Sequence, residues 1–305
     1  MEVNKIYHGD CLELFKNIPT DFVQTTFADP PFNLRKKYRG HKDNMTQHDY
    51  LCWCDKWLAE MVRVTKPNGS IFIHNIPYWL SYYCCCLNEI EEISFKHWIS
   101  WDSPTAPMGK SLQPAHYGIL YYSKGEECKF NEIRYLNKRC RECRYLLKDY
   151  GGKKDTIPEF GPLVSDVWTD MHRVKHNKYK DEHPCQLPIH LLERIILMST
   201  DEGDVVLDPF MGTGTTAVAA KRLGRQYIGF EKSKEYVEVA EIKLEKEKEL
   251  SKIDNVWVSK FGGHRGMCKV VTIRSVDWKL LKSHFDLPSE TKKLNSKEIS
   301  LKRNQ

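Results

Sequence analysis

The chain of 305 residues is 41% hydrophobic and 29% charged, a composition typical of a folded globular protein rather than of a disordered or fibrous one. The uncharged stretch 71–88 contains histidine, asparagine and proline and is too polar for a membrane span, and the first ten residues lack the apolar run of a secretory signal. Eleven cysteines, an odd number, do not match a secreted disulfide framework. We therefore expect a cytoplasmic protein with reduced thiols.

The net charge of +6 is distributed unevenly along the chain. Residues 1–100 carry −1, residues 101–180 carry +5, residues 181–250 carry −5 and residues 251–305 carry +7. Positive charge concentrated in a middle segment and in the tail favours a polyanionic partner, with nucleic acid as the first candidate. The alternative is that these basic segments are only solvated.

The first part of the chain is predicted to alternate strands and helices. Residues 23–28 form a short apolar strand that ends at Asp29-Pro30-Pro31, because proline removes backbone donors and forces the chain out of the sheet. An amphipathic helix is expected over 47–65, followed by a turn at 66–69 and a strand over 70–74. The next expected elements are a helix over 78–91 and strands over 95–101 and 118–123.

The alternation stops between residues 124 and 182, a basic segment interrupted by glycine and proline that is typical of an insertion. It then resumes with a helix over 187–200, a strand over 205–207, a helix over 215–223, a strand over 226–230 and a helix over 233–252, and the tail has one expected strand over 269–273. This order predicts an α/β domain with a mostly parallel central sheet. The expected divisions are a first half over 1–123, the insertion over 124–182, a second half over 183–250 and a basic C-terminal extension over 251–305.

A glycine-rich turn follows the strand at 205–207, in the sequence Asp208-Pro209-Phe210-Met211-Gly212-Thr213-Gly214-Thr215-Thr216. A strand, a loop with two glycines and a helix bring backbone close to a ligand and point the helix N-terminus at it, which suits a nucleotide-like cofactor. Glu231 ends the next strand, where its carboxylate can accept hydrogen bonds from ribose hydroxyls. The dinucleotide fingerprint G-x-G-x-x-G is not met, which disfavours NAD.

A second motif, Asp29-Pro30-Pro31-Phe32, stands at the end of the strand over 23–28. It combines a carboxylate, a proline carbonyl and an aromatic ring at the sheet edge where α/β folds bind ligands. The exocyclic amine of a nucleobase is a poor nucleophile because its lone pair is conjugated into the ring. Two acceptors, Asp29 and the Pro30 carbonyl, would free that lone pair while Phe32 stacks on the base. The alternative is an ordinary turn with Phe32 in the core.

Together and in this order, the two motifs resemble the circularly permuted β class of DNA amino-methyltransferases, S-adenosylmethionine-dependent enzymes of the restriction-modification type. The resemblance covers about residues 5–245 and includes His183-Pro184-Cys185-Gln186-Leu187-Pro188, although the family often has lysine where Leu187 stands. It implies a Rossmann-like methyltransferase fold in which the catalytic half precedes a target-recognition insertion and the cofactor half follows. The turn that begins at Asp29 and the later glycine turn are therefore expected to converge on one cleft.

The resemblance also implies roles for individual residues. The target base would be held by Asp29, Pro30, Pro31 and Phe32. S-adenosylmethionine would be bound by Asp10, Asp208, Phe210, Gly212, Thr213, Gly214, Thr215 and Glu231, with Glu231 on the ribose and Asp10 near the adenine. An alternative for Asp10 is the N-cap of a helix that begins at Cys11.

Double-stranded DNA is the expected partner, with a cognate restriction endonuclease as a further functional partner. The enzyme must flip its target nucleotide out of the stack, which costs a few kcal/mol. Phosphate contacts offset that cost. The candidate residues for these contacts lie in the basic loop after the catalytic motif and are Arg35, Lys36, Lys37 and Arg39. The alternative is a solvated loop.

The insertion contains Cys140 and Cys143 at the spacing of a zinc-ligand pair. A tetrahedral site needs two more ligands, for which Cys128, His172 and His176 are available, but two free thiols are the favoured interpretation.

The expected reaction is methylation of an exocyclic amine in DNA, with adenine N6 favoured because cytosine-N4 enzymes often have serine where Asp29 stands. Three alternatives remain: a cytosine-N4 enzyme, a methyltransferase for RNA or protein glutamine, and a nucleic-acid-binding protein with a vestigial cofactor site. The acceptor motif of the second alternative usually begins with asparagine, and the intact glycine turn with Glu231 argues against the third.

Overall fold

The computed structural model describes residues 1–34, 37–38, 41–42, 44–103, 112–135, 151–152, 163–169, 171, 186–247, 258–259 and 270–274. The chain divides into two compact units, of which unit 1 comprises Met1–Phe130 and Asp166–Glu249, and unit 2 comprises Asn131–Ser165 and Leu250–Gln305. Unit 2 thus combines part of the expected insertion with the expected C-terminal extension.

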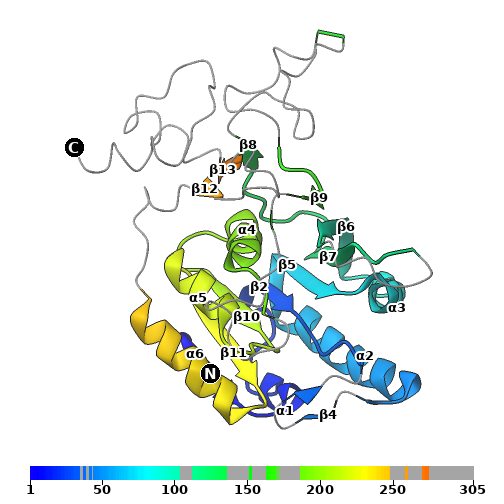
Figure 1. Ribbon diagram of the computed structural model, residues 1–305, viewed down its shortest axis with the longest axis vertical. Helices are drawn as coiled ribbons and strands as arrows, with labels where there is room; N and C mark the ends of the chain where they lie inside the picture. The colour runs from blue at the N-terminus through cyan, green and yellow to red at the C-terminus, as the bar shows by residue number, and fades with distance from the viewer. Residues whose placement is uncertain are drawn as a thin grey trace. The chain divides into compact units, whose positions relative to one another are not determined.

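Unit 1 is built on an eight-stranded sheet with strand order β1-β11-β10-β2-β5-β7-β6-β9 (Figure 1). The strands are β1 (Lys5–His8), β2 (Val23–Ala28), β5 (Thr65–Asn75), β6 (Ile93–Asp102), β7 (His116–Lys124), β9 (Val167–Trp168), β10 (Val205–Asp208) and β11 (Gln226–Glu231). The first five strands in this order are mutually parallel, β7 is antiparallel to both of its neighbours, and β9 is parallel to β6. The prediction of an α/β fold with a mostly parallel sheet is therefore confirmed.

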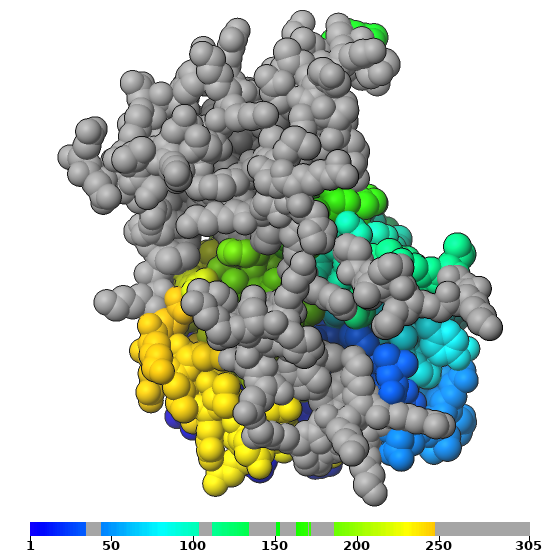
Figure 2. All heavy atoms as spheres, in the orientation of Figure 1, coloured from blue at the N-terminus to red at the C-terminus, as the bar shows by residue number. Residues whose placement is uncertain are grey.

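Two groups of helices cover the sheet. One comprises α1 (Cys11–Phe15), α2 (Gln47–Val64) and α3 (Pro77–Asn88), and the other comprises α4 (Ile189–Ser199), α5 (Thr215–Arg222) and α6 (Lys234–Lys246). Residues alternate between the two faces of a strand. On β10, Leu207 joins the core beneath α1 to α3, while Asp208 contacts α5 on the opposite face. Figure 2 shows α6 on one flank of this unit and α2 with α3 on the other.

β5 begins earlier than the sequence indicates. The expected turn at residues 66–69 lies inside the strand, because Thr65 already pairs with Val23 and the register then shifts before Thr25 pairs with Ser70. Asn68 has a positive φ of 63° in this irregular stretch. Hydrophobic periodicity does not reveal such a local shift. The expected helix over 233–252 is also too long, because α6 ends at Lys246. The other expected elements of unit 1 lie within a few residues of those observed.

Unit 2 contains a three-stranded sheet in the order β12-β13-β8, formed by Val258–Ser259, Val270–Arg274 and Ile133–Tyr135. Both pairings are antiparallel, with Thr272 opposite Tyr135 and Val258 opposite Val271. The expected tail strand over 269–273 therefore exists, and it pairs with a strand of the insertion.

Within the described part of the chain, no helix combines the length and apolar character needed to cross a bilayer.

Candidate functional site

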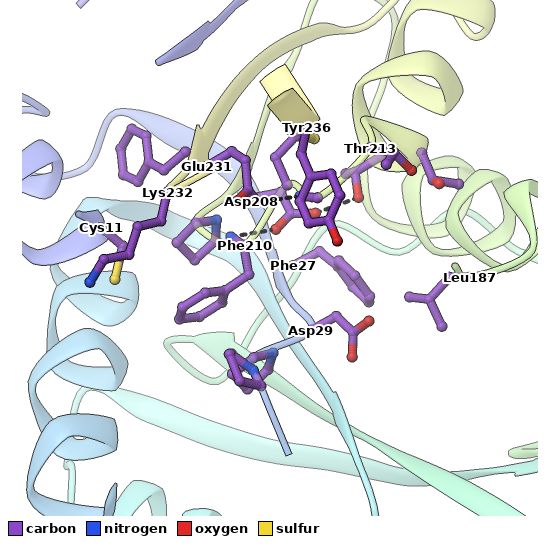
Figure 3. A pocket seen from close by; sticks show the side chains of 18 of the residues that line it. Cys11, Phe27, Asp29, Leu187, Asp208, Phe210, Thr213, Glu231, Lys232 and Tyr236 are labelled. Atoms are coloured by element: carbon purple, nitrogen blue, oxygen red, sulfur yellow. Dashed lines mark hydrogen bonds between the residues drawn. The ribbon is translucent and has the colours of Figure 1, made fainter. Parts of the chain in front are cut away.

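One pocket, with a cavity volume of about 250 Å³, lies at the carboxyl ends of the central parallel strands. β2 and β10 are neighbours, with Thr26 opposite Leu207, so the loops that follow them leave the sheet side by side. Both loops line the pocket, through Asp29 on one side and Phe210 on the other. Figure 3 shows the side chains of Asp29, Asp208, Glu231 and Tyr236 around it. The convergence expected of the two motifs is therefore present.

The loop after β10 is organised by the buried carboxylate of Asp208. Its Oδ1 atom accepts the Phe210 N–H at 2.9 Å, and its Oδ2 atom accepts the Thr216 hydroxyl at 2.5 Å. Asp208 is 2% exposed, and burial raises its pKa to about 7, against the opposing effect of these two hydrogen bonds. Asp208 thus ties the start of the turn to the first residues of α5.

The two glycines of this turn have different surroundings, although both have positive φ, 54° at Gly212 and 84° at Gly214. Gly212 lines the pocket, whereas Gly214 caps α5 and is not among the pocket-lining residues. A Cβ at Gly214 would lie 2.6 Å from the Cβ of Ala240 on α6. The missing side chain at Gly214 therefore allows helix packing, and Gly212 is the glycine that brings backbone to the cavity.

Glu231 ends β11, and each oxygen of its carboxylate accepts a backbone hydrogen bond. Oε2 accepts the Gly212 N–H at 2.8 Å, and Oε1 accepts the Ser233 N–H at 2.7 Å. Burial raises the pKa of Glu231, while the hydrogen bonds from the Ser233 and Gly212 backbone oppose that rise. Each carboxylate oxygen has a second lone pair, so Glu231 can still accept hydrogen bonds from a ligand.

Asp10 has the N-cap position that the sequence offered as the alternative to a cofactor contact. It is the N-cap of α1, accepting the Leu12 N–H at 3.0 Å, and it also lines the pocket. Its other oxygen lies 3.3 Å from the Lys232 Nζ atom, which comes from the residue after Glu231. This ion pair joins the end of β1 to the end of β11 at the pocket rim.

The Asp29-Pro30-Pro31-Phe32 loop is held through its backbone carbonyls. The Tyr50 hydroxyl of α2 donates to the Pro31 carbonyl, and the Trp79 indole N–H of α3 donates to the Phe32 carbonyl at 2.6 Å. The Asp29 carboxylate contacts His74 Nδ1 at 2.8 Å. Phe32 is 4% exposed, its ring is tilted against that of Tyr117, and the residue also lines the pocket. The loop is therefore fixed before any ligand arrives.

The two halves of the site are joined by aromatic packing. Phe210, from the glycine turn, contacts Trp53 and Trp57 of α2 with ring centroids 5.5 and 5.3 Å apart. Trp53, Phe210 and Tyr236 also line the cavity, which supplies flat apolar surface for a ring system.

The charge of the lining suits a cationic ligand that carries hydroxyl groups. Among the described residues, the carboxylates of Asp10, Asp29, Asp208 and Glu231 line the cavity together with Lys232. A sulfonium cation with a ribose and an adenine matches this combination of acidic acceptors and aromatic walls. The carboxylate acceptors and the aromatic side chains of this pocket therefore fit S-adenosylmethionine.

Of the expected cofactor residues, all but Gly214 line this pocket, and all four residues of the Asp29 motif do so. Arg35, Lys36 and Arg39 lie outside the described residues, and Lys37 is described only as part of the two-stranded ribbon β3 (Lys37–Tyr38) and β4 (His41–Lys42). Cys140, Cys143, His172 and His176 also lie outside the described residues. In the part that is described, no three His, Cys, Asp or Glu side chains are grouped to hold a metal ion.

Sequence reasoning missed several residues that shape the site: Tyr50, Trp53, His74, Trp79 and Tyr236. The sequence did contain a signal for His74. This residue ends the expected strand over 70–74, just as Asp29 follows the end of the expected strand over 23–28. The three residues on α2 and α3 belong to apolar helix faces, and periodicity does not tell which of these side chains reaches a loop carbonyl.

Sequence comparison relates the chain to known proteins. The family model described as DNA methylase matches residues 23–242. The type II methyltransferase M.BamHI of Bacillus amyloliquefaciens is 47% identical over 233 residues, covering 75% of this chain and 55% of that protein. The type II methyltransferase M.HpaI of Haemophilus parainfluenzae is 34% identical over 244 residues, covering 78% of this chain and 73% of that protein. This chain thus spans about half the length of the first relative.

Structural comparison agrees. The crystal structure of an M1.HpyAVI–SAM complex matches with a TM-score of 0.52 and 25% sequence identity, covering 79% of this chain and 98% of that chain.

Proposed function

The chain belongs to the DNA methylase family, and on that premise we propose that it transfers a methyl group from S-adenosylmethionine to the exocyclic amine of a base in DNA. The observation that carries this proposal is the convergence of the Asp29 loop and the Asp208–Gly214 turn on one acidic, aromatic-walled pocket. A DNA-binding protein without catalysis would have no need for such a pocket.

The cofactor half of the pocket would hold S-adenosylmethionine, which supplies an electrophilic methyl group on a positively charged sulfur. Glu231 would accept hydrogen bonds from the ribose hydroxyls through the lone pairs that the Gly212 and Ser233 amides leave free. Asp10 lies at the rim, where its carboxylate would accept from the adenine amine. The carboxylates of Asp10, Asp29 and Glu231, among the described lining residues, favour the sulfonium over a neutral thioether, which helps the product leave.

The Asp29 half would bind the target amine. Asp29 and the Pro30 carbonyl each accept one amine hydrogen, which favours a pyramidal nitrogen with its lone pair available. Tyr50 and Trp79 hold the next two carbonyls, so the loop does not have to reorganise during the reaction. Phe32 offers a ring edge or face to the extruded base.

The charge division supports double-stranded DNA as the substrate. Unit 2 contains 20 Lys and Arg against 10 Asp and Glu, a net charge of +10, whereas unit 1 has a net charge of −4. A basic unit attracts the phosphates of DNA, whereas an acidic catalytic unit repels them from the cofactor site. This division of charge therefore fits a protein that binds DNA. The loop with Arg35, Lys36, Lys37 and Arg39 is proposed to add contacts beside the flipped nucleotide. A restriction endonuclease that recognises the same site is the proposed functional partner.

The test is transfer of a tritiated methyl group to unmethylated DNA, followed by digestion and chromatography of the nucleosides. We expect label in N6-methyladenine, because Asp29 resembles the adenine enzymes. Label in N4-methylcytosine would contradict that choice of base and keep the reaction class. Label in 5-methylcytosine, label on RNA alone, or no transfer at all would contradict the proposal. Sequencing that detects modified bases in a host expressing the protein would then give the recognition site.

A further inference from the structure

His74 lies beside Asp29 because the strands that precede them are parallel neighbours. β2 and β5 pair with Ala28 opposite Ile73, so the next residue of each, Asp29 and His74, meet at the carboxyl edge of the sheet. The His74 Nδ1 atom lies 2.8 Å from Asp29 Oδ1. In the tautomer that carries its hydrogen on Nδ1, the imidazole donates this hydrogen to the carboxyl oxygen.

The imidazole is enclosed by aromatic rings. His74 is 2% exposed, and its ring centroid lies 5.8 Å from that of Phe32, 5.7 Å from that of Trp101 and 5.3 Å from that of Tyr117. Its second nitrogen, Nε2, is buried and has no hydrogen-bond partner within the described ranges. Phenylalanine or leucine would fill this enclosure without burying an unpaired nitrogen, which is unfavourable. The sequence nevertheless has a histidine here, and the polar contact it makes is the one with Asp29.

This contact restrains the group that the proposed reaction depends on. A free aspartate side chain can rotate about two bonds, whereas His74 holds Oδ1 and leaves Oδ2 to meet a ligand. The Asp29 side chain is 14% exposed and lines the pocket, so the carboxyl group can be reached from the cavity while His74 holds Oδ1. Small errors in the placement of a reacting group slow a reaction strongly.

We infer that His74 is a positioning residue, whose Nδ1–H fixes the Asp29 carboxylate so that Oδ2 accepts a hydrogen of the target amine. The inference rests on the proposed function. In the reaction the amine nitrogen forms a bond to the methyl carbon as the carbon–sulfur bond breaks, and sulfur keeps the electron pair. The nitrogen then loses its proton toward Asp29 Oδ2 and water. His74 itself gains and loses no proton in this scheme.

Three substitutions distinguish the effect of the Nδ1–H donor of His74 from the effect of the shape of its ring. His74→Phe keeps an aromatic ring and removes the donor, and His74→Leu is a second donor-free variant. In His74→Asn the amide nitrogen stands at the same number of bonds from the backbone as Nδ1, so the donor is kept and Nε2 is lost. The measurements on the full chain are the single-turnover rate of methyl transfer at saturating DNA and S-adenosylmethionine, and the Kd for S-adenosylmethionine from calorimetry.

We expect the donor-free variants to transfer methyl groups about 10- to 100-fold more slowly with an unchanged Kd, and His74→Asn to recover most of the rate. Wild-type rates in the donor-free variants would overturn the inference. A transfer rate of His74→Asn as low as that of the donor-free variants would also overturn it. The same holds if both donor-free variants lose cofactor binding to the same extent as they lose rate. A wild-type protein that transfers no methyl group would refute the proposed function, and the inference with it.

Discussion

The Asp208 carboxylate accepts the Thr216 hydroxyl at 2.5 Å in a position where only 2% of the Asp208 residue is exposed. This contact links the last residue of β10 to the second residue of α5 and so fixes the ends of the glycine turn. It also places a titratable group in the interior, where burial raises its pKa from 3.8 to about 7. The arrangement has a measurable consequence for the pH dependence of stability.

Because its pKa is raised by folding, Asp208 binds a proton more tightly in the folded protein than in the unfolded chain. Its contribution to stability is fully present below about pH 4 and is lost as the pH rises toward about 7. Asp208→Asn removes this penalty while an amide can still accept the Phe210 N–H and meet the Thr216 hydroxyl. We expect the free energy of unfolding of the variant, relative to wild type, to rise by about 3 kcal/mol between pH 5 and pH 8.

Urea titrations of the ligand-free protein at the two pH values measure this difference. The control is Asp55→Asn, which makes the same substitution at an exposed position of α2, where no carboxyl group is buried. An Asp208→Asn variant that shows no pH-dependent gain would mean that Asp208 titrates normally in the folded state.

Glu231→Gln is expected to weaken the binding of S-adenosylmethionine. The amide of glutamine must turn its NH₂ group toward either the Gly212 or the Ser233 N–H, so one backbone donor loses its acceptor. The ribose would also lose one charged acceptor. Since hydrogen bonds to charged groups contribute about 1.5–3 kcal/mol, the Kd should rise about 10- to 100-fold.

Isothermal calorimetry with S-adenosylmethionine checks this prediction. Glu238→Gln, on the exposed face of α6, is the matched control and should bind as wild type does. Equal affinities of wild type and Glu231→Gln would exclude Glu231 from the cofactor site.

Asp29→Ala is expected to slow methyl transfer severely and leave cofactor binding intact. The substitution removes the acceptor for the amine hydrogen, while the glycine turn and Glu231 keep their own hydrogen bonds. Loss of a group that takes a proton costs about 10²–10⁴ in rate. Single-turnover transfer to DNA and calorimetry with S-adenosylmethionine give the two quantities. A wild-type rate of transfer in the variant would show that Asp29 takes no part in the reaction. An equal loss of S-adenosylmethionine binding would show that the loop supports the cofactor half instead.

The sequence was enough to predict the order of elements in unit 1 and the convergence of two distant turns. Both predictions follow from local signals, because alternating strands and helices give a parallel sheet whose loops gather at one edge. Asp29 and Phe210 could therefore be placed in one pocket although 180 positions separate them.

Other features depend on contacts that no local pattern records. The early start of β5 follows from its pairing with β2, and the tail strand β13 pairs with β8 of the insertion, far away in the chain. The glycines of the turn look equivalent in sequence, yet Gly214 is needed because Ala240 packs against it. Tyr50 and Trp79, which donate to the carbonyls of the loop after β2, can be identified only once α2 and α3 are packed on the sheet.

The basic loop after the catalytic motif is expected to contact DNA phosphates. Each phosphate that a lysine neutralises releases counterions, so the logarithm of the binding constant falls linearly with the logarithm of the salt concentration. Replacing Lys36 and Lys37 together by alanine should weaken binding to any duplex and reduce the magnitude of this slope by about 2. Cofactor affinity should not change, because Asp10, Gly212 and Glu231, which line the pocket, are left as they are.

Fluorescence anisotropy with a labelled duplex over a series of salt concentrations gives the slope. The control replaces Lys5 and Lys16 by alanine, which removes the same charge from exposed positions. Lys5 begins β1, so it lies at the amino ends of the parallel strands, whereas the pocket lies at their carboxyl ends. The control should therefore keep the wild-type slope. If both double variants lose the same slope, the effect is one of net charge, and the loop makes no phosphate contact of its own.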